Sequence, residues 1–170
     1  MEIVAMTPAF AVDIASWRYP APYDCYDMVG VAPDFLTDPA NGYFALVSRG
    51  LEETAQLGSH ARLIGFRSFG ADGQVPGGRY DDSALDTGGG LRPDLTGHGL
   101  GREAISTGLD FGRRTYAPAA FRVTVASFNL RARRVVESLG FVHADRFEAT
   151  TNAMSYDLFV EPERNNSPTP

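Results

Sequence analysis

The length and composition of this chain describe one ordinary globular domain and exclude several classes of protein. Its 170 residues, 44% hydrophobic and 21% charged, are enough to bury a single sizeable core. No apolar stretch approaches the roughly 18 residues that a membrane-spanning helix needs, and a formal net charge of −6 argues against a nucleic-acid surface.

Cysteine and histidine usage narrows the chemistry further. The single cysteine, Cys25, excludes an internal disulfide, and three scattered histidines give no metal-ligand spacing, so we expect no metal. All 15 basic residues are arginine, so the chain offers no lysine to an acyl donor. The first ten residues lack a basic segment ahead of an apolar one, which predicts no secretory signal and a cytoplasmic location.

In chain order, the N-terminal half is predicted to contain a strand, a helix, an irregular segment and further strands. Residues 2–6 form a short strand, after which Thr7 caps a helix from Pro8 to about Trp17. Residues 17–35 are dense in aromatic residues, proline and aspartate, which predicts a loop with short helical turns. Strands are then expected at 42–49 and 61–70, a turn at 71–78, and an extended strand at 80–91 that is weakened by glycines.

The C-terminal half is predicted to alternate helices and strands. A helix is expected from Gly99 to Arg114, followed by a buried strand at 119–128. Asn129 caps a second helix that ends at Gly140 and leaves its arginines toward solvent or ligand. The remaining segments are strands at 141–147 and 153–160, within a single domain of residues 1–160, and a disordered tail at 161–170.

The stretch LRPDLTGHGLGREAI, residues 91–105, places three glycines between a predicted strand and a predicted helix. The first turn of a helix has unpaired N–H groups and a partial positive charge, so this arrangement binds anions. A dinucleotide fingerprint fails because Gly97 and Gly99 are followed by Gly101 and Arg102, and a nucleoside triphosphate loop fails for want of a lysine. The plainer alternative is a glycine-rich turn before a core helix.

This stretch resembles the pyrophosphate loop of the GNAT superfamily of N-acetyltransferases, whose pattern is Arg or Gln, two residues, Gly, one residue, Gly or Ala. Gly99 and Gly101 match that pattern, Pro93 precedes the loop, and an amphipathic helix follows it. Thr96 stands at the first position, which removes one long side chain from the phosphates. The backbone amides that make the family's main contacts are retained.

A later segment, VTVASFNLRARRVVESLGFVHADRF, also resembles the family: strand, Asn129, amphipathic helix, Leu-Gly-Phe, strand. Together the two segments span roughly residues 84 to 147. The resemblance implies an α/β fold with a mixed, twisted sheet of six to seven strands, flanked by helices on both faces and splayed at its central parallel strands. It also implies acetyl-CoA, or another acyl-CoA, bound at that splay as co-substrate.

The resemblance carries the cofactor contacts onto particular residues. The strand before the loop would hold the pantetheine arm, and the loop would hold the diphosphate. Asn129 would contact the cofactor from the other side. The residues so assigned are Leu91, Arg92, Thr96, Gly97, His98, Gly99, Leu100, Gly101, Arg102 and Asn129. Asn129 is alternatively a plain helix cap, and Arg102, with Arg133 and Arg134, alternatively lies on a solvated helix face.

The implied reaction is direct acyl transfer to a bound amine, which in this family often uses a base before the loop and a tyrosine acid. Asp86 is the candidate base, followed by Asp81 and Asp82; alternatively, Asp86 caps a turn or binds the substrate ammonium. The tyrosine position falls on Val136, which cannot donate a proton. An α-amine of pKa near 7.8 is neutral roughly once in 7 molecules at pH 7, an alkylamine roughly once in 2,500. A peptide N-terminus or an amino acid therefore fits better than a small alkylamine.

The aromatic segment after the first helix is the candidate acceptor site, because an aromatic and acidic wall suits a cationic amine. Its candidate residues are Trp17, Tyr19, Tyr23, Asp24 and Tyr26. Trp17 and Tyr19 alternatively pack the first helix on the sheet, and Cys25 has no nearby histidine to activate it.

Two other functions stay open at this point. One is a non-catalytic acyl-CoA-binding or regulatory domain of the same fold, which a valine at position 136 permits. The other is a nucleotide-binding protein unrelated to CoA. A homodimeric assembly is also left open.

Overall fold

The computed structural model describes residues 1–48 and 61–162. Short 3₁₀ turns connect several of the longer elements, and the segment between α1 and α2 contains one at Tyr23–Tyr26. In chain order the helices and strands are β1 (Glu2–Ala5), α1 (Pro8–Ser16), α2 (Pro33–Thr37), β2 (Tyr43–Ser48), β3 (Arg62–Phe69), β4 (Leu85–Leu91), α3 (Gly101–Tyr116), β5 (Phe121–Ala126), α4 (Leu130–Ser138), β6 (Val142–Glu148) and β7 (Ser155–Val160).

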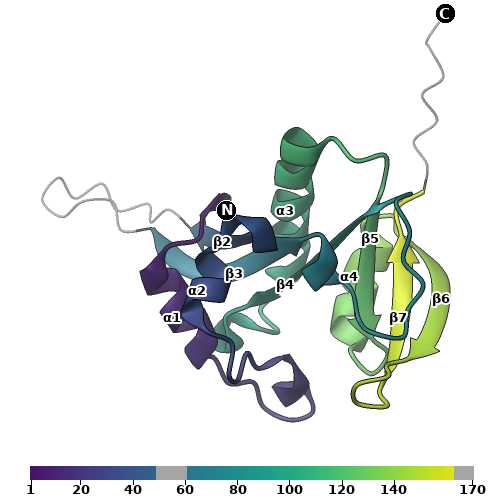
Figure 1. Cartoon of the computed structure of the whole chain (residues 1–170), viewed down its shortest axis with the longest axis horizontal. Coiled ribbons are helices and arrows are strands. Elements are labelled where there is room, and N and C mark those ends of the chain that lie inside the picture. The colour runs from purple at the N-terminus through teal and green to yellow at the C-terminus, as the bar shows by residue number, and fades with distance from the viewer. Residues whose placement is uncertain (49–60, 163–170) are drawn as a thin grey trace, which may run out of the picture.

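The strands form one seven-stranded sheet in the order β1-β2-β3-β4-β5-β7-β6 (Figure 1). Every neighbouring pair is antiparallel except β4 and β5, which run parallel. Those two strands pair only at Leu85↔Phe121 and Asp86↔Arg122. Beyond this short joint they diverge, which confirms the predicted splay between the central parallel strands.

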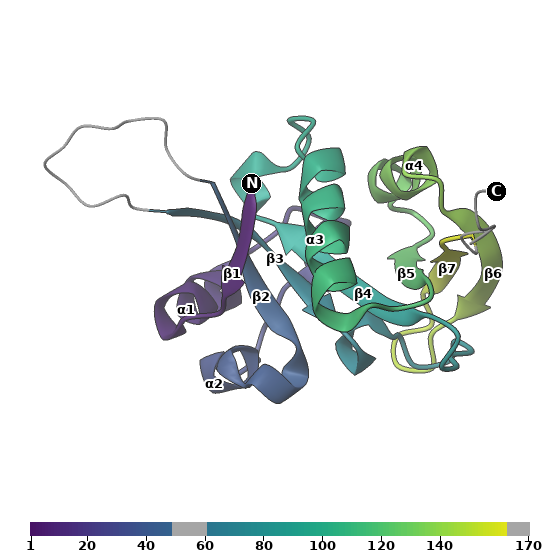
Figure 2. The same ribbon diagram turned by 90° about the horizontal axis from the view of Figure 1, so that it is seen from above.

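Helices cover both faces of the sheet, as predicted (Figure 2). Side chains alternate across a strand, so neighbouring residues of β2 point to opposite faces. Val47 packs in a cluster with Ala11 and Ile14 of α1, whereas Leu46 packs in a cluster with Ala104 of α3. α1 and α3 therefore sandwich the N-terminal half of the sheet.

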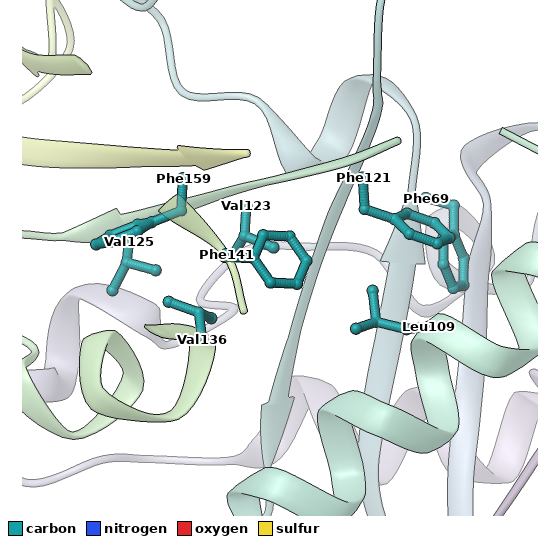
Figure 3. Close-up of a cluster of buried hydrophobic side chains, with 8 residues drawn as sticks. All are labelled: Phe69, Leu109, Phe121, Val123, Val125, Val136, Phe141 and Phe159. Carbon is teal, nitrogen blue, oxygen red and sulfur yellow. The ribbon is translucent and has the colours of Figure 1, made fainter. Parts of the chain in front are cut away.

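The largest buried cluster lies between the sheet and helices α3 and α4 (Figure 3). It joins both halves of the sheet, because β3, β5 and β7 all contribute to it. Its buried members are Phe69, Leu109, Phe121, Val123, Val125, Val136, Phe141 and Phe159. Val136, the position of the missing tyrosine, is only 1% exposed and belongs to this core.

Most of the predicted elements are observed with small shifts at their ends. The extended strand expected at 80–91 starts only at Leu85, because the Asp81 carboxylate accepts hydrogen bonds from the Ser83 backbone and hydroxyl and closes a turn. The helix α2 was expected only as a helical turn. The end of the strand predicted at 42–49 and most of the tail predicted at 161–170 lie outside the described residues. Within the described part of the chain, none of the helices combines the length and apolar character needed to cross a membrane.

Candidate active site

A cavity of about 650 Å³ lies where β4 and β5 diverge. Its walls come from strands β3, β4 and β5, from α3 and α4, and from the aromatic segment after α1. The two helices that flank it, α3 and α4, lie on the same side of the sheet (Figure 2). The cavity thus connects the glycine loop, the splay and the aromatic segment in one continuous space.

The glycine loop enters α3 at one end of this cavity. Gly97 and Gly99 have φ angles of 82° and 81°, which side chains other than glycine adopt only with strain. The helix begins at Gly101, and its N-cap residue Leu100 supplies no capping side chain. The first-turn N–H groups of α3 are therefore open to a ligand at the positive end of the helix.

Arginine side chains surround the loop. Arg131 of α4 lies so close that a side chain at Gly97 would meet its guanidinium at 3.3 Å, and it also stacks on the ring of Tyr23 at 4.2 Å. Arg134 lines the same cavity. Arg102 also lines it and donates hydrogen bonds to the carbonyl and hydroxyl oxygens of Ser138. These charges make the loop end of the cavity suited to phosphate groups.

β4 offers an open backbone edge toward the cavity. It pairs with β3 from Thr87 to Leu91 but with β5 only at Leu85 and Asp86, so the second edge of its glycine run, residues 88–90, has no partner strand among the described residues. Peptide groups on such an edge are ready to hydrogen-bond an extended ligand. Residues 88–90 are all glycines, so no side chain projects from this part of the strand.

The chain resembles solved acetyltransferase structures along nearly its whole length. No protein-family model matches the sequence, and no curated protein matches it. A chimera of the Vibrio cholerae spermidine N-acetyltransferase SpeG and hSSAT is 17% identical, with a TM-score of 0.64 over 95% of both chains. The Salmonella typhimurium protein yncA, solved with its cofactor acetyl-CoA, is 20% identical over 99% of this chain and 96% of its own, with a TM-score of 0.62. A GNAT-family protein of Bordetella pertussis is 15% identical over 94% of this chain and 93% of its own, with a TM-score of 0.61.

The chain has the GNAT fold. The seven-stranded sheet, its single parallel contact and the helices on both faces agree with this assignment. The expectation that the sequence raised about the fold is thereby confirmed.

Most of the predicted cofactor residues meet at the cavity of this GNAT fold. Asn129 lines it and also caps α4, because its side-chain oxygen accepts a hydrogen bond from the backbone N–H of Ala132 at 3.1 Å. The other predicted residues that line it are Leu91, Thr96, Gly97, Gly99, Gly101 and Arg102. Three predicted residues, Arg92, His98 and Leu100, are not among its lining residues; Arg92 instead forms an ion pair with Asp94.

The predicted acceptor residues divide into two groups. Tyr19, Tyr23 and Tyr26 line the cavity, and the Tyr19 hydroxyl donates to the Leu91 carbonyl at 2.7 Å. Trp17 and Asp24 do not line it. Trp17 is 6% exposed and packs in the core beneath α1, which is the alternative that the sequence had left open.

Tyr26 is 36% exposed, lines the cavity and has a specific partner. Its hydroxyl accepts a hydrogen bond from the Asn129 amide at 3.2 Å. Burial raises the pKa of Tyr26 to about 12, against the smaller opposing effect of that hydrogen bond. The hydroxyl therefore keeps its proton across the physiological range, on a residue that lines the cavity.

Asp86 lies outside the cavity lining and is held in an ion pair. Its carboxylate accepts from Arg122 Nε at 2.6 Å and Nη2 at 2.9 Å, and from the Gln74 amide at 2.7 Å. The carboxylate is 4% exposed, and this placement does not support a role as general base. Asp81 bonds the same arginine from a solvent-exposed position, and Asp82 is likewise absent from the cavity lining.

Two charged residues of the cavity were not singled out from the sequence. Asp72 follows β3 in a 3₁₀ turn at Ala71–Gly73 and brings a carboxylate to the aromatic wall. Arg67 lies within β3 itself and is 6% exposed. Neither position carries a recognisable motif. The sequence around Asp72 predicts only a turn, and Arg67 is one charge in an otherwise apolar strand.

Proposed function

We propose that this protein is an N-acetyltransferase that moves an acetyl group from acetyl-CoA, or another acyl-CoA, directly to a primary amine. The observation that carries the proposal is the single cavity that joins the glycine loop to an aromatic and acidic wall. A structure of the same fold solved with acetyl-CoA adds support. Fold alone does not define the acceptor, because one scaffold serves many substrates.

The cofactor would enter at the N-terminus of α3. The diphosphate would bind the open amides of residues 97–101, with Arg131 and Arg134 adding positive charge. The pantetheine arm would then follow the unpaired edge of β4 toward the joint at Leu85 and Asp86. Main-chain N–H groups of this edge are suited to stabilise the oxyanion that forms when the thioester carbonyl is attacked.

The acceptor amine would approach along the aromatic wall. The Asp72 carboxylate is suited to hold its ammonium form and to accept the proton that the nitrogen loses. A C–N bond forms, the C–S bond breaks, and CoA leaves as a thiolate; because the pKa of a thiol is about 8.5, this departure needs no strong acid. Tyr26, with its retained proton, is one of the tyrosines lining the cavity that can supply one.

A peptide N-terminus, an amino acid or a small amine can each serve as the acceptor. An α-amine needs the least help, since a larger fraction is neutral at pH 7. No tyrosine stands at position 136, and the carboxylate at Asp72 lies in an exposed turn. Both features favour an acceptor of lowered pKa.

The experiment combines calorimetry with CoA and thiol release from acetyl-CoA across a panel of amines. Gly99→Ala strains a φ of 81° without filling any space, because nothing lies within 4 Å of the added carbon. We expect the Kd for CoA to rise by roughly 5- to 30-fold, since such strain costs on the order of 1–2 kcal/mol.

Gly140→Ala is the matched control. Gly140 has a φ of 92° and equally open surroundings, but it ends α4 and lies outside the cavity lining. It should lose similar stability and leave CoA binding unchanged. Wild-type protein that binds no CoA would overturn the proposal, and binding without turnover on any amine would favour a regulatory acyl-CoA-binding domain.

A further inference from the structure

Arg67 is a buried cation with a single hydrogen-bond partner among the described residues, and it borders the cavity. Its Nη2 donates to the Thr87 hydroxyl at 2.8 Å, and its Nε is buried with no hydrogen-bond partner. No carboxylate in residues 1–48 and 61–162 forms an ion pair with it. A guanidinium carries five N–H donors, so most of its capacity is unused.

Two glycines make room for this arginine. A methyl group at Gly108 of α3 would lie 2.6 Å from Arg67 Nε and 2.9 Å from its Cδ. A methyl group at Gly89 of β4 would lie 2.9 Å from the same Cδ and 3.0 Å from Nη1. The side chain is therefore clamped between helix and strand, with its stem and Nε packed directly against the two glycines.

Such a charge is expensive to bury. A buried ion without a partner destabilises a fold by several kcal/mol, and proteins normally pair it. Burial lowers the pKa of Arg67 to about 10, which still leaves the guanidinium protonated near pH 7. The folded protein thus presents an uncompensated positive charge to the cavity, where an anionic ligand would neutralise it.

The position of Arg67 indicates which part of the reaction supplies that anion. Along β3, Arg67 alternates with Phe66, which packs with Tyr19 and Tyr43 on the α1 side of the sheet. Arg67 therefore points to the α3 side, where the glycine loop lies. Gly108 is about 10 Å along the helix axis from Gly101, so Arg67 lies well away from the loop amides that would bind the diphosphate.

We propose that Arg67 binds a carboxylate at the far end of the acyl group, so that the preferred donor is the CoA thioester of a short dicarboxylic acid. This inference rests on the proposed function and names its acyl donor. In the transfer, the amine nitrogen forms an amide with the thioester carbon, the C–S bond breaks, and CoA leaves as thiolate while the nitrogen loses its proton. The distal carboxylate stays on Arg67 throughout and is unchanged.

The test compares succinyl-CoA with acetyl-CoA as donors for wild type and Arg67→Met. The wild type should show the higher kcat/KM with succinyl-CoA. In the variant, the ratio of the two kcat/KM values should fall by about tenfold or more, because a hydrogen-bonded charge pair is lost only for the dicarboxylic donor. Its Tm should be unchanged or raised, since the variant removes an unpaired buried charge.

One control variant and two contrary outcomes keep this inference separate from the proposed function. Arg62→Met, an exposed arginine of the same strand, should leave the ratio unchanged. If acetyl-CoA supports CoA release but the ratio of the two kcat/KM values is the same in wild type and Arg67→Met, this inference is overturned and the proposed function stands. No release from any donor and no binding of CoA would overturn both.

An acceptor pair completes the design. Phenylalanine and phenethylamine differ only by a carboxylate, so they report whether the acceptor carries the group that Arg67 binds. If Arg67→Met changes the preference between these amines and not between the donors, the assignment to the acyl group is wrong.

Discussion

Two buried arginines on either side of the splay have opposite surroundings. Arg122, at the joint of β4 and β5, meets both oxygens of Asp86, bonds the Asp81 carboxylate and backbone, and lies 5.0 Å from the ring centre of Tyr80. Arg67 has one hydroxyl, that of Thr87, as its hydrogen-bond partner within the part of the chain that the structure describes. The satisfied charge holds the two halves of the sheet together, whereas the unsatisfied one is available to a ligand.

Breaking the Arg122 pair should have the largest effect. Arg122→Met leaves the Asp86 carboxylate buried without its partner, and we expect the free energy of unfolding to fall by about 3–5 kcal/mol. Urea denaturation followed by circular dichroism measures this loss. Arg67→Met, measured in the same way, should cause no such loss.

The double variant Asp86→Leu with Arg122→Met is the control for that prediction. It removes both charges, so a large part of the lost stability should return. If Arg122→Met alone cost under about 1 kcal/mol, the pair would not be structural, and a catalytic role for Asp86 would have to be reconsidered.

An intermediate effect is expected where Arg67 passes α3. Gly108→Ala pushes a methyl group onto the arginine stem, and we expect a loss of about 1–3 kcal/mol through overpacking. In an Arg67→Met background the more flexible, uncharged side chain relieves that contact, and the better helix propensity of alanine, about 1 kcal/mol, should dominate. A double-mutant cycle by urea denaturation measures the change of sign, and equal losses in both backgrounds would contradict the clamped geometry.

The smallest effect concerns a third cluster, in which Arg146 and His143 bond the buried Asp157 carboxylate at 2.6 and 3.0 Å. Burial opposes its ionisation, but these hydrogen bonds, with the nearby charge of Arg133, outweigh it and hold the pKa of Asp157 below its usual range. The stabilisation is therefore fully present above the ordinary aspartate pKa of about 3.9 and is lost as pH falls through the lower folded value.

Asp157→Asn removes this titration, so its stability should change less steeply than that of the wild type below about pH 4. We expect a difference of about 1 kcal/mol or less, because Arg146 and His143 are roughly half exposed and solvent screens them. Urea denaturation at stepped pH values measures it, and parallel profiles would show that the cluster does not contribute.

Local signals made much of this fold predictable. The glycine loop, α3 and the Asn129 cap each depend on residues within a few positions of one another, and all three are observed. The burial and ion pairing of Asp86 depend on Arg122, which is 36 residues away. In the sequence, Asp86 is therefore only an isolated acidic residue before a glycine run. The cavity side of Arg67 depends on the register of β3 and on two distant glycines, Gly89 and Gly108, which no local pattern encodes.

The open edge of β4 has a consequence for how such a protein can diverge. A binding surface built from peptide groups survives the exchange of almost any side chain, provided that the strand keeps its path. Substitutions can then change the surrounding residues and the choice of substrate, while the proposed binding of the CoA part of the donor is retained. Contacts made by main-chain groups can therefore be retained between proteins whose sequences are no longer similar.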